Sequence, residues 1–274
     1  MDRYAVIGNP IAQSKSPLIH AAFAKAHGQT IEYTTLLASA DSFVATVRGF
    51  IAAGGRGMNV TAPFKLQAFE LADAATERAQ RAGAVNAMKF DAGRILADNF
   101  DGIGLVADIQ RNLGVALAGK RVLLLGAGGA TRGALLPLLE QGPALLAIAN
   151  RDLAKAEQLV AGLDGADRSR VVVACYGDLA DERFDIVVNA TSASLNGELP
   201  PLAQHVFAPG CLAYELVYGR GLTPFLRLAR DAGATRLADG VGMLVEQAAE
   251  AFAWWRGVRP DTRPVIDKLT VALV

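Results

Sequence analysis

One stretch of the sequence indicates the fold of this chain most clearly: Arg121-Val-Leu-Leu-Leu-Gly-Ala-Gly-Gly-Ala-Thr-Arg-Gly133. Its apolar run, Val122 to Leu125, is typical of a parallel strand that helices cover on both faces. The glycines that follow predict a tight turn whose backbone comes close to an anion. Residues 130–140 then predict a helix whose N-terminus attracts phosphate. We interpret the stretch as a dinucleotide-binding turn rather than an ordinary tight turn.

From Gly102 onward, strands and helices alternate as a doubly wound parallel sheet requires. We expect strands here at 122–125, 144–149, 170–174, 186–188 and 212–216, and helices at 130–140, 152–162 and 222–232. The N-terminal part predicts strands at 4–8, 31–37, 58–61, 84–88 and 94–97, and helices at 17–26, 41–53, 64–74, 78–83 and from about 102 to 113. A long helix at 240–255 and a tail helix near 265–273 complete the chain.

Composition narrows the class of partner. The 27 Lys and Arg residues balance the 27 Asp and Glu residues, so no basic field favours nucleic acid or an acidic membrane. No apolar run approaches the roughly 20 residues that span a bilayer, and the N-terminus does not resemble a signal peptide. His20, His27 and His205 form no convincing metal set, and Cys175 and Cys211 are isolated. We expect a cytoplasmic protein with a small-molecule partner and no metal.

Two loops near the N-terminus carry candidate catalytic and binding groups. Ser14 and Ser16 lie between the end of a strand and the start of a helix, where open α/β sheets bind ligands. A helix cap would account for only one of these serines. Lys65 falls in the first turn of a predicted helix, where the dipole disfavours a cation, which suits a lysine that exchanges protons. Asp101 is either an ordinary helix N-cap or the partner of that lysine.

The residues after the second strand of the sheet indicate which nucleotide binds. An NAD-specific protein usually has an acid there, whereas this chain has Asn150 and Arg151, with Lys155 one turn further on. The guanidinium of Arg151 suits a ribose 2′-phosphate, so NADP is expected rather than NAD. Asp152 either opposes that phosphate or caps the helix that begins there.

Three further positions are weaker candidates. Asn189 and Thr191 follow an apolar strand where a nicotinamide ribose or the pyrophosphate would pass, although polar residues are also common in loops. Gln247 lies in the apolar stripe of the last long helix, where a buried amide needs a partner. We favour a ligand contact for it over a structural hydrogen bond.

Several motifs together resemble the shikimate dehydrogenase family over nearly the whole chain. They are Gly8-Asn-Pro-Ile11 with Ser14-Lys-Ser-Pro17 and His20, Asn59-Val-Thr61 with Pro63 and Lys65, Ala82-Gly-Ala-Val-Asn86, Gly126-Ala-Gly-Gly-Ala130, and Gly240-Val-Gly-Met-Leu244 with Gln247. The resemblance implies a two-domain α/β protein, in which a Rossmann-type doubly wound parallel sheet is inserted in a discontinuous α/β substrate domain. We expect residues 1–101 and 239–274 to form the substrate domain and residues 102–238 the NADP-binding domain.

The resemblance also implies a reaction and the residues that carry it. The reaction is the NADP-dependent interconversion of shikimate and 3-dehydroshikimate in aromatic amino acid biosynthesis, by an enzyme that is a monomer or a homodimer. Lys65 and Asp101 would be the catalytic pair. Substrate binding would fall to Ser14, Ser16, Thr61, Asn86, Tyr218 and Gln247. Cofactor binding would fall to Gly126, Gly128, Gly129, Ala130, Asn150, Arg151, Lys155, Asn189, Thr191 and Gly240.

The chain departs from the usual family pattern at a few positions near these residues. The family usually has Thr where this chain has Ala87, Phe100 and Asp152, and Asp where it has Glu215; Gln13 replaces a usual His. These departures leave open a quinate/shikimate dehydrogenase paralogue with relaxed substrate or cofactor choice. They also leave open a catalytically weak nucleotide-binding sensor. The retained Lys65 and Asp101 argue against the sensor.

Overall fold

The computed structural model describes residues 1–179 and 181–273, which form two compact units. The first unit consists of Met1–Gly104 and Leu244–Val265. The second consists of Leu105–Met243 and the described chain from Ile266 onward.

The first unit contains a six-stranded mixed sheet with the strand order β2-β1-β3-β5-β6-β4. Strands β1 and β2, and β1 and β3, run parallel, whereas β5 runs antiparallel to both β3 and β6. The elements are β1 (Asp2–Gly8), α1 (Ser16–Ala26), β2 (Ile31–Leu37), α2 (Phe43–Ala52), β3 (Gly55–Val60), α3 (Lys65–Leu71), β4 (Ala74–Ala75), α4 (Glu77–Ala82), β5 (Ala87–Asp91), β6 (Arg94–Asp98) and most of α10 (Val241–Arg256).

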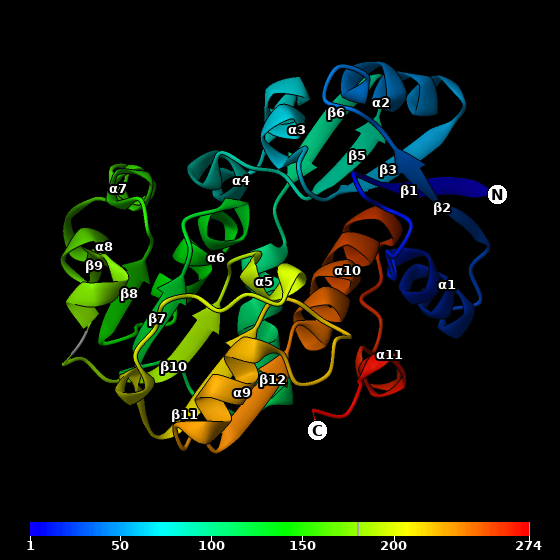
Figure 1. Cartoon of the computed structure of the whole chain (residues 1–274). Coiled ribbons are helices and arrows are strands. Elements are labelled where there is room, and N and C mark those ends of the chain that lie inside the picture. Colours follow the sequence, from blue (N-terminus) through cyan, green and yellow to red (C-terminus); the bar gives the residue numbers. More distant parts are fainter. Residues whose placement is uncertain (180, 274) are drawn as a thin grey trace. The chain divides into compact units, whose positions relative to one another are not determined.

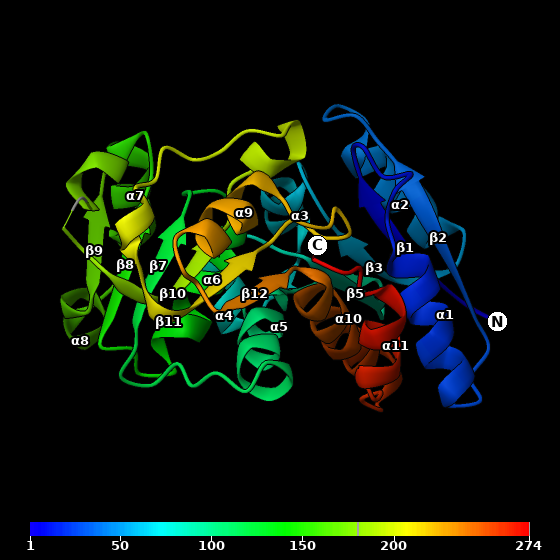
Figure 2. The same ribbon diagram turned by 60° about the horizontal axis from the view of Figure 1, so that its bottom comes forward.

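Helices cover both faces of this sheet (Figures 1 and 2). On one face, Ala5 and Ile7 of β1 pack with Phe43 of α2 and with Phe64, which precedes α3. On the other, the ring of Tyr4 stacks on Trp255 of α10 at a centroid distance of 4.8 Å. Because side chains alternate along a strand, a single strand serves both layers.

His20 of α1 is a buried polar group in this layered core. Its Nε2 donates to Oδ1 of Asn59 at 3.1 Å, and its ring stacks on Tyr33 at 4.3 Å. Nδ1 has no hydrogen-bond partner among the described residues. Burial lowers the pKa of His20 from 6.5 to about 3, so the folded protein holds a neutral imidazole.

The second unit contains a six-stranded sheet with the order β12-β11-β10-β7-β8-β9, in which every pairing is parallel. The elements are the end of α5 (Asp101–Ala107), which starts within the first unit, the π-helical turn η1 (Asp108–Asn112), β7 (Arg121–Leu125), α6 (Gly129–Leu139), β8 (Leu145–Ala149), α7 (Leu153–Val160), α8 (Gly165–Ser169), β9 (Val171–Ala174), the 3₁₀ turn η2 (Tyr176–Leu179), β10 (Phe184–Asn189), the 3₁₀ turns η3 (Ala193–Asn196) and η4 (Gln204–Val206), β11 (Phe207–Glu215), α9 (Pro224–Asp231), β12 (Arg236–Asp239) and α11 (Arg263–Leu269), which also starts within the first unit.

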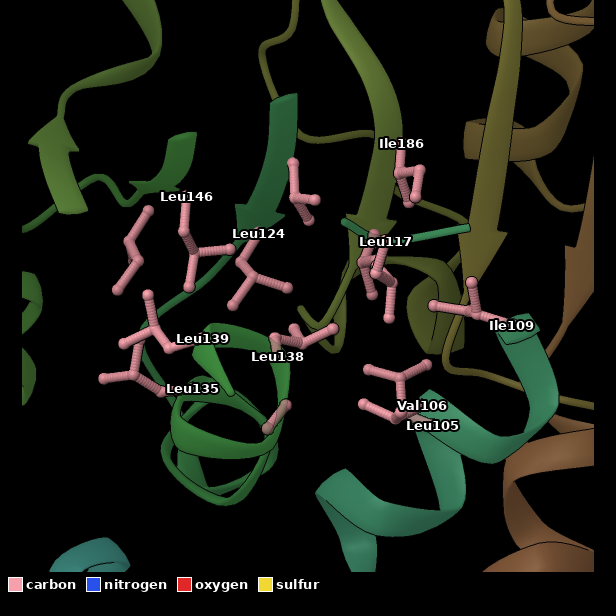
Figure 3. Close-up of a cluster of buried hydrophobic side chains, with 14 of the residues drawn as sticks. Leu105, Val106, Ile109, Leu117, Leu124, Leu135, Leu138, Leu139, Leu146 and Ile186 are labelled. Atoms are coloured by element: carbon pink, nitrogen blue, oxygen red, sulfur yellow. The ribbon is translucent and has the colours of Figure 1, made fainter. Parts of the chain in front are cut away.

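The apolar run of β7 serves two cores at once. Val122 and Leu124 face a cluster with α5 and α6, of which Figure 3 shows Leu124, Leu138 and Leu146 among others. Leu123 and Leu125 face a second cluster with α9. This confirms the doubly wound parallel sheet predicted from the continuous apolar strand.

Several element boundaries differ from the sequence-based expectation. Strand β11 starts at Phe207 instead of 212, because Pro209 and the left-handed Gly210 made its first half look like a loop. The four-residue strand β12 and the five-residue helix α8 were missed, since such short elements show no clear periodicity. The expected helix to Leu113 ends as α-helix at Ala107 and continues as the π turn.

None of the helices in the described part of the chain combines the length and apolar character that crossing a bilayer requires. Nowhere among residues 1–179 and 181–273 do three His, Cys, Asp or Glu side chains gather in a way that could hold a metal ion.

Gly57 tests the close packing of β3 against α10. A Cβ at this position would lie 2.6 Å from Nε1 of Trp255, which donates to the carbonyl oxygen of Met88 at 3.0 Å. We expect Gly57→Ala to lower the free energy of unfolding by roughly 1–3 kcal/mol, measured by urea denaturation. The control is Gly49→Ala in α2, where a Cβ meets nothing within 4 Å and the helix should be slightly stabilised. Equal stabilities of both variants would contradict the packing.

His20 predicts how stability depends on pH. Below pH 6.5 the unfolded chain binds a proton that the folded chain does not accept until about pH 3. Stability should therefore fall as the pH drops through this window, with His20 contributing up to about 1.4 kcal/mol per pH unit. We expect urea denaturation between pH 7 and 4 to show a shallower loss for His20→Phe than for the wild type. The exposed His27, changed to Gln, should keep the wild-type slope; an unchanged slope in His20→Phe would overturn this reading of the buried imidazole.

Candidate active site

The candidate catalytic residues gather at one edge of the first unit's sheet. The parallel strands β1 and β3 end there, and Lys65 begins α3 just beyond β3. Because β5 runs antiparallel to β3, its start lies at the same edge, where Val60 N donates to the carbonyl oxygen of Asn86 at 2.8 Å. Strand β6 pairs with β5 and also ends there, so Asp101, the first residue of α5, follows close behind.

Lys65 and Asp101 form an ion pair. Nζ of Lys65 donates to Oδ2 of Asp101 at 2.5 Å, and the side chains are only 19% and 9% exposed. Of the two roles expected for Asp101, the structure therefore shows the pairing with Lys65. The expected placement of Lys65 in the first turn of a helix is also confirmed. A lysine and a carboxylate at this distance, shielded from bulk water, can share and move a proton.

Asn86 fixes the position of the carboxylate. Its Nδ2 donates to Oδ1 of Asp101 at 2.8 Å and to Oε1 of Gln247 at 3.2 Å, while its Oδ1 accepts from Phe100 N at 2.8 Å. Gln247 in turn donates to the carbonyl oxygen of Leu244 at 2.7 Å. The buried Gln247 thus has two hydrogen-bond partners, Asn86 and Leu244. Together with Lys65, which binds Asp101, four segments of the chain converge on this network.

The two serines lie at the same sheet edge, after β1. Ser14 is half-buried and its Oγ accepts from Ser16 N at 3.3 Å, while Ser16 is 6% exposed as the first residue of α1. The hydroxyl of Ser14 thus binds the first amide of α1, whereas Lys15 at the N-cap makes no side-chain cap hydrogen bond. Thr61, directly after β3, is half-buried, and its amide donates to the carbonyl oxygen of Ile7 at 3.0 Å.

Two of the departures, Ala87 and Phe100, belong to one apolar cluster with Ala251. The ring of Phe100 meets Trp254 edge to face at 5.8 Å, and the guanidinium of Arg78 lies 5.1 Å from its centroid. The ring, which is 3% exposed, thus packs into the core beside α10. The contact with Trp254 could not be predicted from the position of Phe100 in the sequence alone.

The second unit carries the candidate nucleotide site at the start of α6. Gly126 has φ +100°, a conformation that a side chain would strain, and a Cβ on Gly128 would meet nothing within 4 Å. The first amides of α6, from Gly129 and Ala130, receive no side-chain cap. Open backbone with uncapped helical amides fits the pyrophosphate of a dinucleotide.

The residues after β8 are exposed. Arg151 forms no hydrogen bond or ion pair within the described chain, so its guanidinium is available to a ligand. Burial raises the pKa of the Tyr176 phenol, and the positive charge of Arg151 acts in the opposite direction. Tyr176 was not among the residues that the sequence indicated. Asp152 accepts from Lys155 N at 3.3 Å and so caps α7, one of the two roles expected for it. The ammonium of Lys155 also lies 3.8 Å from this carboxylate. Asn150 donates to the carbonyl oxygen of Asp152 at 2.7 Å.

The remaining candidates follow the neighbouring strands. Asn189 ends β10 and is fully buried, and its Oδ1 accepts from the amide and the hydroxyl of Thr191 at 3.1 and 2.7 Å. Tyr218 lies in the loop after β11, where burial raises the pKa of its phenol. Gly240, directly before α10, lies against the carbonyl oxygen of Leu216.

Family models match three parts of the chain. They describe a shikimate dehydrogenase substrate binding domain (residues 6–88), a shikimate / quinate 5-dehydrogenase (108–196) and a shikimate 5'-dehydrogenase C-terminal domain (240–270). A curated relative, shikimate dehydrogenase (NADP(+)) of Nitrosospira multiformis, is 57% identical over 99% of this chain and 98% of its own.

Solved structures agree with the models. An Ael1 enzyme from Pseudomonas putida is 63% identical, with a TM-score of 0.94 over 100% of both chains. A shikimate 5-dehydrogenase from Thermus thermophilus, solved in complex with NADP(H) and shikimate, is 30% identical, with a TM-score of 0.87 over 97% of this chain and 98% of that one. These similarities cover the whole chain, its two-domain fold and the segments that hold Lys65 and Arg151, and the chain therefore belongs to the shikimate dehydrogenase family.

Proposed function

We propose that this chain is an NADP-dependent shikimate dehydrogenase, which interconverts shikimate and 3-dehydroshikimate. The ion pair between Lys65 and Asp101, held by Asn86, is the observation that carries the proposal. The similarity to relatives named as NADP(+)-dependent shikimate dehydrogenases supports the same substrate and cofactor. The quinate paralogue and the nucleotide sensor are not favoured by these relatives.

The proton transfer follows from the ion pair. In the direction of oxidation, the amine form of Lys65 takes the proton of the reacting hydroxyl, and Asp101 stabilises the ammonium that results. In reduction, the same ammonium returns the proton to the carbonyl oxygen. Bound NADP would supply the acceptor for the hydride that leaves the substrate carbon.

We assign the remaining roles by position in the chain. Ser14 and Ser16 would hold the substrate carboxylate, with Thr61, Asn86 and Gln247 on its hydroxyls and Tyr218 beside it. The turn at residues 126–130 would hold the pyrophosphate, Asn150, Arg151 and Lys155 the 2′-phosphate, and Asn189, Thr191 and Gly240 the nicotinamide half. The open backbone at Gly128 and the unpaired Arg151 support the nucleotide part of this assignment.

The proposal also covers organisation and location. Residues 1–101 and 239–274 would form the substrate-binding domain and residues 102–238 the NADP-binding domain, in keeping with the substrate-domain match at residues 6–88. We propose a cytoplasmic enzyme that acts as a monomer or a homodimer.

Lys65→Ala tests the proton carrier. The wild type should reduce NADP when given shikimate, followed by NADPH absorbance, and the variant should lose at least about 10²-fold in kcat because a positioned acid/base is removed. The thermal unfolding temperature should fall, because the carboxylate of Asp101 loses its cation, so the rates are compared below the unfolding transition. Lys25→Ala, at an exposed position near the end of α1, is the control and should keep wild-type rates. Survival of turnover within a few-fold would show that Lys65 carries no proton.

Arg151→Ala tests the choice of nucleotide. Loss of hydrogen bonds to a charged group should weaken NADP binding by roughly 1.5–3 kcal/mol and leave NAD binding nearly unchanged, measured by calorimetry. Arg227→Ala on the exposed face of α9 should change neither affinity. If NADP and NAD weaken equally in Arg151→Ala, the arginine does not recognise the 2′-phosphate.

A further inference from the structure

The second unit contains a buried carboxylate that the reaction does not use. Glu215 is the last residue of β11, is fully buried, and stands in register with Asn189, the last residue of β10. Its Oε2 accepts from Asn189 Nδ2 at 3.1 Å, Ser194 Oγ at 2.5 Å and Thr223 Oγ1 at 3.1 Å. Its Oε1 accepts from Val217 N at 3.3 Å. One carboxylate thus joins the loop after β10 to the loop after its own strand.

Burial of the Glu215 carboxylate lowers the free energy gained on folding. None of the four donors carries a charge, and burial raises the pKa of Glu215 although its hydrogen bonds act in the opposite direction. Burying a carboxylate without a cation costs desolvation free energy, which hydrogen bonds from neutral donors offset only in part. The carboxylate is therefore better explained by the geometry that it imposes on the two loops.

On one side, Glu215 orients the amide of Asn189. Since Nδ2 points to the carboxylate, Oδ1 is left to accept both hydrogen bonds from Thr191. Thr191 in turn packs on the turn at the start of α6, because a Cβ built on Gly126 would lie 3.0 Å from its methyl group. The carboxylate thereby reaches the candidate pyrophosphate loop through two intermediate residues.

On the other side, Glu215 holds the loop that carries Tyr218 at both ends. Val217 N binds one oxygen at the start of this loop, and Thr223 Oγ1 binds the other at its end. Thr223 also caps α9 by accepting from Leu226 N at 3.3 Å. Glu215 thus connects both ends of this loop, and Asp239 binds its middle by accepting from Gly219 N at 2.9 Å.

We propose that Glu215 is a positioning residue of the nucleotide site, which holds the segments 189–194 and 217–223 in the shape that binds NADP. This inference rests on the proposed function, because it assigns a role in binding that cofactor. It predicts that removing the acceptor weakens NADP binding more than shikimate binding, which Glu215 reaches only through the loop that carries Tyr218.

Two variants with side chains of nearly equal size test this role of Glu215. Glu215→Leu removes every acceptor, and we expect it to raise the Kd for NADP at least about tenfold by calorimetry, with a smaller rise in the KM for shikimate at saturating NADP through the loop of Tyr218. Its thermal unfolding temperature should also fall, because the buried donors of Asn189, Ser194 and Thr223 lose their acceptor, and the Kd is therefore measured below the unfolding transition. Glu215→Gln keeps an oxygen that can accept from the same hydroxyls and should restore the Kd to within about threefold of the wild type.

The outcomes distinguish this inference from the proposed function. A folded Glu215→Leu that binds NADP as tightly as the wild type would overturn the positioning role while the dehydrogenase function stands. A wild type that binds no NADP would instead contradict the proposed function. If Glu215→Leu does not fold, Asn189→Asp serves in its place: it sets a second carboxylate against Glu215, should weaken NADP by a similar factor, and overturns the proposal if it does not. Glu182→Gln, an exposed acid of the same unit, should leave the Kd unchanged.

Discussion

The contact between the ammonium of Lys65 and the carboxylate of Asp101 is the constraint on which the first unit's active edge depends. Both side chains are largely withdrawn from water, so each needs the other, and the carboxylate also needs Asn86. This ion pair and its hydrogen bonds bring together the starts of α3, β5 and α5. Gln247, inside α10, lies beside them through its hydrogen bond with Asn86. The mixed sheet provides that place, because the carboxyl ends of β1 and β3 and the amino end of β5 share an edge.

The second unit follows a related rule with different chemistry. Its sheet is wholly parallel, so the turn at Gly126, Asn189 and Glu215 all stand at the carboxyl edge, where open α/β sheets bind their ligands. There the backbone is left open by glycine while buried polar side chains hold the loops around it. In both units, apolar clusters pack against the faces of the sheet behind this edge.

The parts of this molecule that depend on local chemistry were predictable from the sequence. The apolar run at Val122 and the glycines after it predicted strand, turn and helix, and the unfavourable helix position of Lys65 marked a special lysine. The partners of buried polar groups were harder to predict, because they come from distant segments: Gln247 meets Asn86, and Asn189 meets Glu215. The contact of Phe100 with Trp254 was hidden for the same reason, since only the folded chain brings the two rings together.

The central claim is that a proton moves between the substrate hydroxyl and Lys65 with Asp101 as the partner that stabilises the charge. The rate of shikimate oxidation by Asp101→Asn at saturating NADP tests it most directly, since the amide keeps the size of the carboxylate and removes its charge. We expect kcat of Asp101→Asn to fall by about 10²-fold or more, with NADP affinity unchanged. A variant that turns over within a few-fold of the wild type would contradict it.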